Sequence, residues 1–230
     1  MTRTSRRTFL GAATCALLHR PAVSAATDSE LVFDVYRDDE PIGVHGLSFH
    51  REGDDLVVDI TIDLEVVFAW VTVFRYTHQN REVWRDGRLQ RLDSATHDDG
   101  TDHIVSIRRE ADELVIDADG TRNVAPGHLL TTGYWHPGTP EQSMLVGTQK
   151  GRILKIAYRA QGSETITVAG APAEARRFDV SGDLRMTMWY GADGLWNGMA
   201  FDARGSDIDY RVRTRPDDMA WNAIVAQTTI

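Results

Sequence analysis

The clearest hydrophobic pattern in the chain runs over residues 56–67 and has a period of two. Its even positions are all apolar, and most of its odd positions are polar or charged. Successive side chains of a β-strand point to opposite faces, so this alternation predicts a strand with one buried and one solvated face. At about 3.3 Å per residue, the strand would be roughly twice the usual length. Such a strand needs a wide antiparallel sheet to cover its apolar face.

The same parity continues for several residues beyond this stretch, through Tyr76. One straight strand of that length would be too long, so we expect a bend or bulge near Phe68 and Ala69. Asp-Gly pairs at 86–87 and 119–120 predict tight hairpin turns. Short strands recur along most of the remaining chain at a spacing of roughly 8–12 residues, which is typical of a sandwich or a barrel.

The regular spacing of short strands is interrupted between Ala125 and Leu145, where proline, glycine and aromatic residues cluster. Thr139 followed by Pro140 predicts one short helical turn near residues 140–145. Long irregular segments in compact domains are often functional, so we expect residues 127–145 to form a lid or rim. The fold prediction is all-β: a strongly curved antiparallel meander sheet, closed or nearly closed into a barrel.

Residues 1–25 have the pattern of an export leader. Arg6 and Arg7, followed by Phe9 and Leu10, resemble the twin-arginine export signal. A short apolar run and a group of small residues come next, and we place cleavage after Ala25. The prediction is a periplasmic protein that meets the twin-arginine translocase during export and has no membrane span in its mature form.

Three regions follow from these patterns. They are a signal peptide at residues 1–25, a single all-β domain at 26–213 and a C-terminal tail at 214–230, which we expect to be irregular. The single cysteine, Cys15, falls in the leader. The mature chain therefore has no disulfide, and its stability must come from a packed core.

Charge narrows the choice of partners. The sequence has 25 basic and 34 acidic residues and a net charge of −9. Cleavage after Ala25 would remove four arginines and no acid, which leaves a net charge of −13. Nucleic acid and anionic membrane surfaces are poor partners for a chain of this charge.

Several short motifs, taken together, resemble a family of uncharacterised bacterial exported all-β domains of unknown function. They are Ile42-Gly43, the run from Thr132 to His136, the run from Gly147 to Gly151, Trp189-Tyr190 and Gly194-Leu195-Trp196. The resemblance implies a curved antiparallel sheet, broadly like the periplasmic lipoprotein carriers in fold alone. It supplies no catalytic residues.

Aromatic residues are the strongest candidates for a binding site. A short loop at 191–194 would place Trp189 opposite Trp196 across a hairpin. Aromatic walls around a barrel interior could hold a lipid or another apolar small molecule, although the same rings could instead fill the barrel. The candidate ligand-binding residues are Trp70, Tyr134, Trp135, His136, Trp189 and Trp196.

Other chemistry finds little support in the sequence. Seven histidines remain after cleavage, and no spacing among them matches a metal motif; His128 and His136 are the first residues to consider. His97 and His103 could face each other across the turn at 98–102, whose acidic residues lack the full spacing of a calcium loop. No nucleophile elbow or phosphate loop occurs. We therefore assign no catalytic residues, no metal site and no cofactor.

Three functions remain open. The first is a non-enzymatic periplasmic protein that binds an apolar or amphipathic small ligand within the curved sheet. The second is a structural or protein-interaction module with a filled core. The third is a metal-dependent hydrolase whose site the sequence does not reveal.

Overall fold

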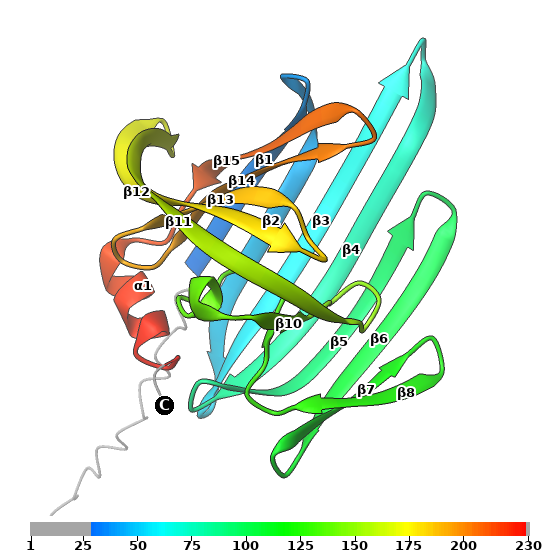
Figure 1. Cartoon of the computed structure of the whole chain (residues 1–230), viewed down its shortest axis with the longest axis vertical. Coiled ribbons are helices and arrows are strands. Elements are labelled where there is room, and N and C mark those ends of the chain that lie inside the picture. Colours follow the sequence, from blue (N-terminus) through cyan, green and yellow to red (C-terminus); the bar gives the residue numbers. More distant parts are fainter. Residues whose placement is uncertain (1–28, 229–230) are drawn as a thin grey trace, which may run out of the picture.

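The computed structural model describes residues 29–228, which form one fifteen-stranded sheet and two short helices (Figure 1). The strands of the first half are β1 (Ser29–Arg37), β2 (Glu40–Glu52), β3 (Asp55–Phe68), β4 (Val71–Arg85), β5 (Arg88–Asp98), β6 (Thr101–Glu110), β7 (Glu113–Ala118) and β8 (Thr121–Pro126). The strands of the second half are β9 (Leu130–Thr131), β10 (Met144–Val146), β11 (Ile153–Val168), β12 (Ala171–Gly182), β13 (Met186–Gly191), β14 (Trp196–Ala203) and β15 (Ser206–Thr214). A 3-10 helix, η1 (Thr139–Glu141), lies between β9 and β10, and α1 (Asp218–Val225) follows β15. The predicted leader lies outside the described residues.

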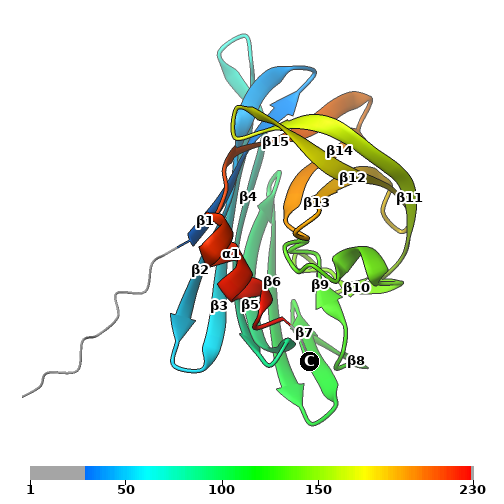
Figure 2. The same cartoon turned by 90° about the vertical axis from the view of Figure 1, so that its left-hand side faces the viewer.

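The first and last strands of the chain lie side by side at the centre of the sheet. β1 pairs with β15 at its centre, and from there the strands run in sequence order to β8 on one side and back to β9 on the other. All neighbours are antiparallel except β9 and β10. Seen edge-on, the long strands of the first half form a wall, and β11–β14 curl back over it (Figure 2). None of the helices in this part of the chain is long and apolar enough to cross a membrane.

The curl does not close. Residues 127–129 join β8 to β9, but these two edge strands form no ladder with each other in the described structure. Of the two predicted forms, closed or nearly closed into a barrel, full closure is therefore wrong, whereas the all-β antiparallel sheet is confirmed. The edges explain the opening: β9 has only two residues and already pairs with β10, and Pro126 ends β8 without an N–H to donate.

The apolar face of β3 lies in the core, as its alternation predicts. Leu56, Val58 and Ile60 are at most 2% exposed. The expected bend near Phe68 is instead a complete reversal, because Phe68 pairs with Val71 and the chain turns through Ala69 and Trp70. Both turn residues have positive φ, of 47° and 68°. Such turns usually carry asparagine or glycine, so the sequence gives no sign of this one.

The irregular segment lies inside the curl rather than on its rim. Trp135 is 1% exposed and Thr139 is fully buried. Within the segment, η1 supplies the predicted short helical turn, one residue earlier than expected and only three residues long. The segment therefore contributes to the core.

Two further expectations are corrected by the second half of the structure. Trp196 pairs with Tyr190 rather than with Trp189, because the register shifts between Trp189 and Tyr190. A one-residue shift reverses the face of a side chain, so Trp196 is fully buried while Trp189 remains partly exposed. The tail is not irregular: Asp217 caps α1 by accepting a hydrogen bond from the Ala220 N–H at 2.7 Å, and Trp221 is buried in the core.

Candidate ligand-binding cavity

The inner face of β4 carries a row of mostly polar side chains, whereas the inner faces of its neighbours are mainly apolar. Alternate residues of β4 point to this face, and the row consists of Tyr76, His78, Asn80, Glu82 and Trp84. All five are less than 9% exposed. Buried polar groups need hydrogen-bond partners, so the partners of each decide what this row does.

Glu82 is fully buried and completely paired. Its Oε1 accepts hydrogen bonds from Asn80 Nδ2 at 3.0 Å and from Thr131 Oγ1 at 2.8 Å. Its Oε2 accepts from Trp84 Nε1 at 2.9 Å and from Trp135 Nε1 at 3.0 Å. Four donors from β4 and the irregular segment thus hold the carboxylate, and Glu82 ties that segment to the sheet.

His78 is also buried, and both of its ring nitrogens have hydroxyl partners. Nδ1 shares a hydrogen bond with Thr96 Oγ1 at 2.8 Å, and Nε2 contacts Thr148 Oγ1 at 3.3 Å. Burial lowers the pKa of His78 to about 4, so the ring is neutral at physiological pH.

His45, on the inner face of β2, has no such support. It is 4% exposed, and neither ring nitrogen has a hydrogen-bond partner within residues 29–228. The ring lies edge-on to Trp196 and Tyr210, with centroids 5.4 and 5.8 Å away. Burial, together with the nearby His78, lowers the pKa of His45 to about 3. A neutral imidazole with two free nitrogens is therefore held among aromatic rings.

Both histidines line one cavity of about 470 Å³ in the curl. Its size lies within the range of small-molecule sites. Asn80 adds an acceptor, since its Oδ1 is buried and unpaired in the described part of the chain. The lining residues are His45, Ile60, Ile62, His78, Asn80, Thr132, Gly133, Tyr134, Thr148, Gln149, Gly182, Asp183, Leu184, Arg185, Met186, Met199, Phe201, Asp202 and Tyr210.

The charged lining residues differ in exposure from the deeper polar ones. Asp183, Arg185 and Asp202 are exposed, whereas His45 and His78 are buried. The inner end of the cavity is thus neutral and polar, and its charges lie toward solvent. Residues 29–228 contain no group of three or more histidine, cysteine, aspartate or glutamate side chains placed to hold a metal ion.

The candidate residues from the sequence are divided among several places. Tyr134 lines the cavity, and Trp196 packs against His45 just outside the lining. Trp135 and His136 belong to the core beside Trp84, with His136 5.6 Å from the Trp84 ring. These four therefore lie in or near the interior.

Two candidates lie elsewhere. Trp70 stands at the β3–β4 turn and is 98% exposed, and Trp189 is partly exposed and donates its Nε1–H to Glu164.

The histidines expected to face each other across the 98–102 turn bind different carboxylates: His97 pairs with Asp102 at 2.7 Å and His103 with Asp119 at 2.8 Å.

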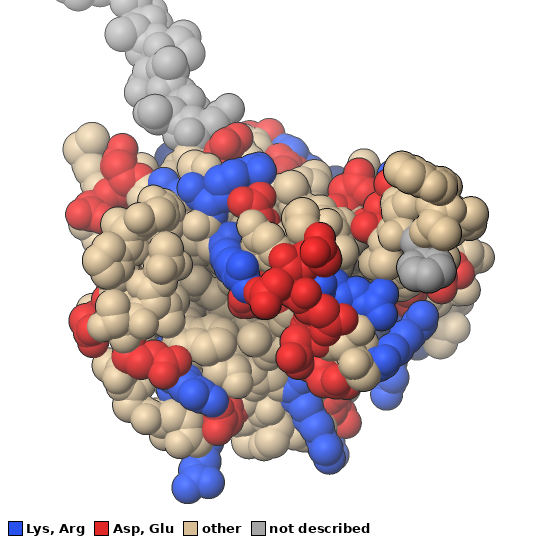
Figure 3. Space-filling model, turned by 90° about the horizontal axis from the view of Figure 1, so that it is seen from above, with Lys and Arg blue, Asp and Glu red and all other residues tan. Residues whose placement is uncertain are grey.

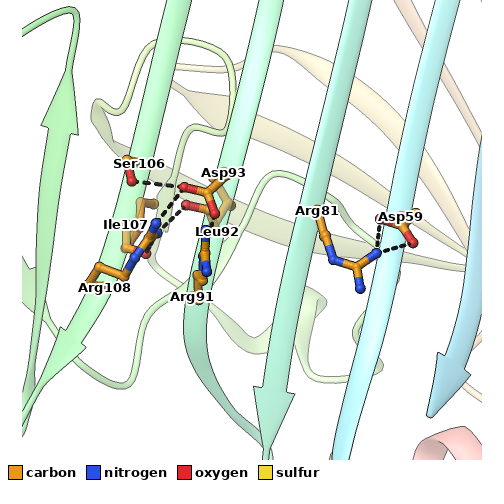
Figure 4. Close-up of polar contacts among 8 residues, drawn as sticks. All are labelled: Asp59, Arg81, Arg91, Leu92, Asp93, Ser106, Ile107 and Arg108. Atoms are coloured by element: carbon orange, nitrogen blue, oxygen red, sulfur yellow. Dashed lines mark hydrogen bonds and ion pairs between the residues drawn. The ribbon is translucent and has the colours of Figure 1, made fainter. Parts of the chain in front are cut away.

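The outer face of the long strands carries paired charges (Figure 4). Arg81 donates to both carboxylate oxygens of Asp59, at 3.0 and 2.9 Å. Asp93 accepts from Arg108 at 2.7 Å and from Ser106 at 2.9 Å. Exposed pairs of this kind typically contribute about 0–1 kcal/mol each. We therefore interpret this face as a solvated surface.

Comparison with known proteins agrees with this architecture. Residues 33–213 match the family described as a domain of unknown function, DUF6134. The chain belongs to the DUF6134 family. The match begins in β1 and ends in β15, so it covers nearly the whole sheet and stops before α1. No curated protein matches the chain.

A solved structure extends the likeness beyond the family. The DUF6134 chain is similar to a crystal structure titled as a beta-barrel-like protein of domain of unknown function DUF1849 from Brucella abortus. The TM-score is 0.58 and the identity 10%, over 81% of this chain and 96% of that chain. At this identity the likeness shows the fold alone. The expected all-β domain of unknown function is confirmed.

Proposed function

We propose that this DUF6134 protein is an exported, non-enzymatic protein that binds a small amphipathic ligand in the cavity of its curled sheet. The observation that supports this most strongly is the buried His45 ring, whose two nitrogens lack partners in the described chain. An unpaired buried polar group costs about 1–3 kcal/mol, and a ligand could offset that cost by pairing with it.

The cavity favours a ligand with a neutral polar head. Burial keeps His45 and His78 uncharged, and the buried inner end offers no opposite charge to a carboxylate or an amine. A hydroxyl or an amide could instead pair with His45 and with Asn80 Oδ1. The apolar part of the ligand would then lie along Ile60, Met199 and Phe201.

The test uses decan-1-ol as a probe, with binding followed by tryptophan fluorescence, because Trp196 touches His45. We expect His45→Phe to weaken decanol binding about tenfold, which corresponds to the loss of roughly 1.4 kcal/mol. His97→Phe is the matched control, since the His97 side chain lies outside the cavity, is 42% exposed and pairs with Asp102. Sodium decanoate at pH 8 should bind more weakly than decanol.

Native mass spectrometry of protein purified from its own periplasm complements the titration. The proposal predicts an added mass that wild-type protein retains and His45→Phe loses. Equal decanol affinity in both proteins would contradict it, and so would a bare mass combined with no response to decanol.

Export is the second part of the proposal, and it rests on the paired arginines of the leader. Replacing Arg6 and Arg7 with lysine should retain the protein in the cytoplasm, because the twin-arginine pathway reads these side chains. Arg20→Lys is the control and should reach the periplasm. Periplasmic accumulation of the Arg6→Lys, Arg7→Lys variant would contradict this route.

A further inference from the structure

The β3–β4 hairpin extends beyond the rest of the sheet. The ladder between β2 and β3 ends at Leu64, and that between β4 and β5 ends at Tyr76. From Glu65 to Arg75 the two strands form a ladder only with each other in the described structure, and one further backbone hydrogen bond, from the Asp99 N–H to the Arg75 carbonyl at 2.9 Å, ties the base to the β5–β6 turn. We call residues 65–75 the arm. Its two strands extend about 13 Å past their neighbours, at roughly 3.3 Å per residue, and their turn is the topmost point in Figures 1 and 2.

The tip of the arm is apolar and exposed. Trp70 is 98% exposed, Val71 62%, Val67 56% and Val73 51%. They are four of the seven large hydrophobic side chains that are exposed among residues 29–228. Seen from above, uncharged side chains cover the right-hand corner of the molecule over this turn, while charged ones cross the middle (Figure 3). Single exposed apolar residues are common, but a cluster of this kind marks an interaction site.

The turn itself adds a second, independent observation. Ala69 and Trp70 both have positive φ, which suits glycine or asparagine and is unfavourable for a bulky side chain. Tryptophan at this position stabilises neither the turn nor the core. Strained residues of this kind cluster at functional positions, which makes this turn a candidate for a role beyond the fold.

The shape of the arm favours a lipid surface over a protein partner. One tryptophan buries about 150–250 Å², and with three valines the tip offers on the order of 400 Å², about half of what each partner buries in a stable protein interface. The tip is convex, and its ladder pairs the backbone groups that the two strands direct toward each other, almost to the turn. Tryptophan prefers the interface between headgroups and acyl chains.

Charges at the base of the arm indicate which kind of lipid surface fits. Arg75 pairs with Asp63 at 3.4 Å and with Glu65 at 3.6 Å, so the base carries no free cationic patch. Arg204 lies over the Phe74 ring, 5.7 Å from its centre, and also pairs with Asp99. The whole chain is acidic, with a net charge of −9. An anionic membrane would repel it, whereas a zwitterionic one would not.

We propose that the arm docks this protein on a neutral lipid bilayer, with Trp70 and the neighbouring valines inserted at the interface. The charged base of the arm then lies at headgroup level, and the sheet stays outside the membrane. This docking does not depend on the cavity ligand, because no lining residue of that cavity belongs to the arm.

The test is cosedimentation of the mature full-length protein with phosphatidylcholine vesicles. We expect the wild type to sediment with them and the double variant Ala69→Asn, Trp70→Gly to lose at least tenfold in partitioning. An Asn-Gly turn preserves the hairpin, so this variant keeps the fold. Met219→Ser is the control, since Met219 is 82% exposed on α1. His45→Phe should also bind vesicles normally.

Three results would overturn the inference. The first is equal partitioning of the wild type and the turn variant. The second is binding only to vesicles that contain anionic lipid. The third is a Trp70-dependent dimer in sedimentation velocity without vesicles, which would make a second copy of the chain the occupant. Quenching of tryptophan fluorescence by lipids brominated on their acyl chains, lost in the turn variant, would support insertion.

Discussion

Glu82 and His45 are buried polar side chains on the same inner face, and they differ in what surrounds them. The carboxylate of Glu82 accepts four hydrogen bonds from side chains of the chain itself. The imidazole of His45 has none within the described residues, although the cavity beside it has room for a molecule. A polar group that the fold satisfies acts as a structural tie, and one that it leaves unpaired invites a partner from outside.

Acidification should lower the free energy of unfolding more than any of the substitutions that follow. Burial lowers the pKa of His45 to about 3 and those of His78 and His136 to about 4, against 6.5 for a free histidine. Above pH 6.5 the folded and unfolded states are both neutral at these sites. Below it only the unfolded state takes up protons, so stability is lost as the pH falls from 6.5 toward 4. We expect three histidines to cost about 6 kcal/mol by pH 5, at about 1.4 kcal/mol per unit each.

Urea unfolding at pH 7, 6 and 5 measures this loss. The His45→Phe variant provides the control, because it should lose about one third of the slope between pH 6 and pH 5. An unchanged slope in this variant would contradict the assignment of His45 as a buried neutral ring.

Glu82→Ala should have the next largest effect. It leaves the indole N–H groups of Trp84 and Trp135 and the donors of Asn80 and Thr131 without their acceptor. We expect a loss of about 3–5 kcal/mol in the free energy of unfolding, measured by urea denaturation. Asp59→Ala, on the solvated face, is the control and should cost less than about 1 kcal/mol. Equal losses in the two variants would remove the structural role of Glu82.

His45→Phe should change stability in the opposite direction. Phenylalanine fills a similar volume among Phe33, Trp196 and Tyr210, and it removes two unpaired nitrogens. We expect the free protein to gain about 1–3 kcal/mol in the free energy of unfolding while its decanol binding weakens. Thermal unfolding without ligand measures the gain. A destabilised variant would show that His45 serves the fold rather than a ligand.

The smallest expected effect belongs to His78, whose partners are two threonines. Thr96→Val removes the 2.8 Å partner and should cost about 1 kcal/mol. Thr148→Val removes two longer contacts, to His78 at 3.3 Å and to the Thr132 hydroxyl at 3.2 Å, and should cost less. Chemical denaturation of both variants gives the order. If Thr148→Val cost more than Thr96→Val, the threonine that lines the cavity would matter more for stability than the one on β5.

The sequence predicts the sheet better than it predicts the cavity. Period-two alternation places Leu56, Val58 and Ile60 inside correctly, because the apolar parity is unbroken there. On β4 the inward positions are mostly polar, so the same rule gives no sign that His78 and Glu82 face the core. Their partners Thr148 and Thr131 come 70 and 49 residues later, a separation that no local pattern reveals.

Turn chemistry explains the other differences. Asp-Gly at 86–87 and 119–120 marks two hairpins correctly, since both positions accept positive φ. Ala69 and Trp70 turn the chain without such a signal, and the expected bend proved to be a full reversal. The capping Asp217 precedes a helix of only eight residues, which is too short for a helical period to be distinct.

The pairing of β1 with β15 has a consequence for chain connectivity. Val32 lies beside Thr214, so the natural ends of the sheet meet at its centre, while the two edges are successive in the chain. If the ends were linked and the backbone opened at Gly127, the strands would follow one another across the sheet in strict order, from β9 to β15 and then from β1 to β8. A circular permutant cut there replaces the longest-range pairing by a local one, and it should refold faster than the natural chain.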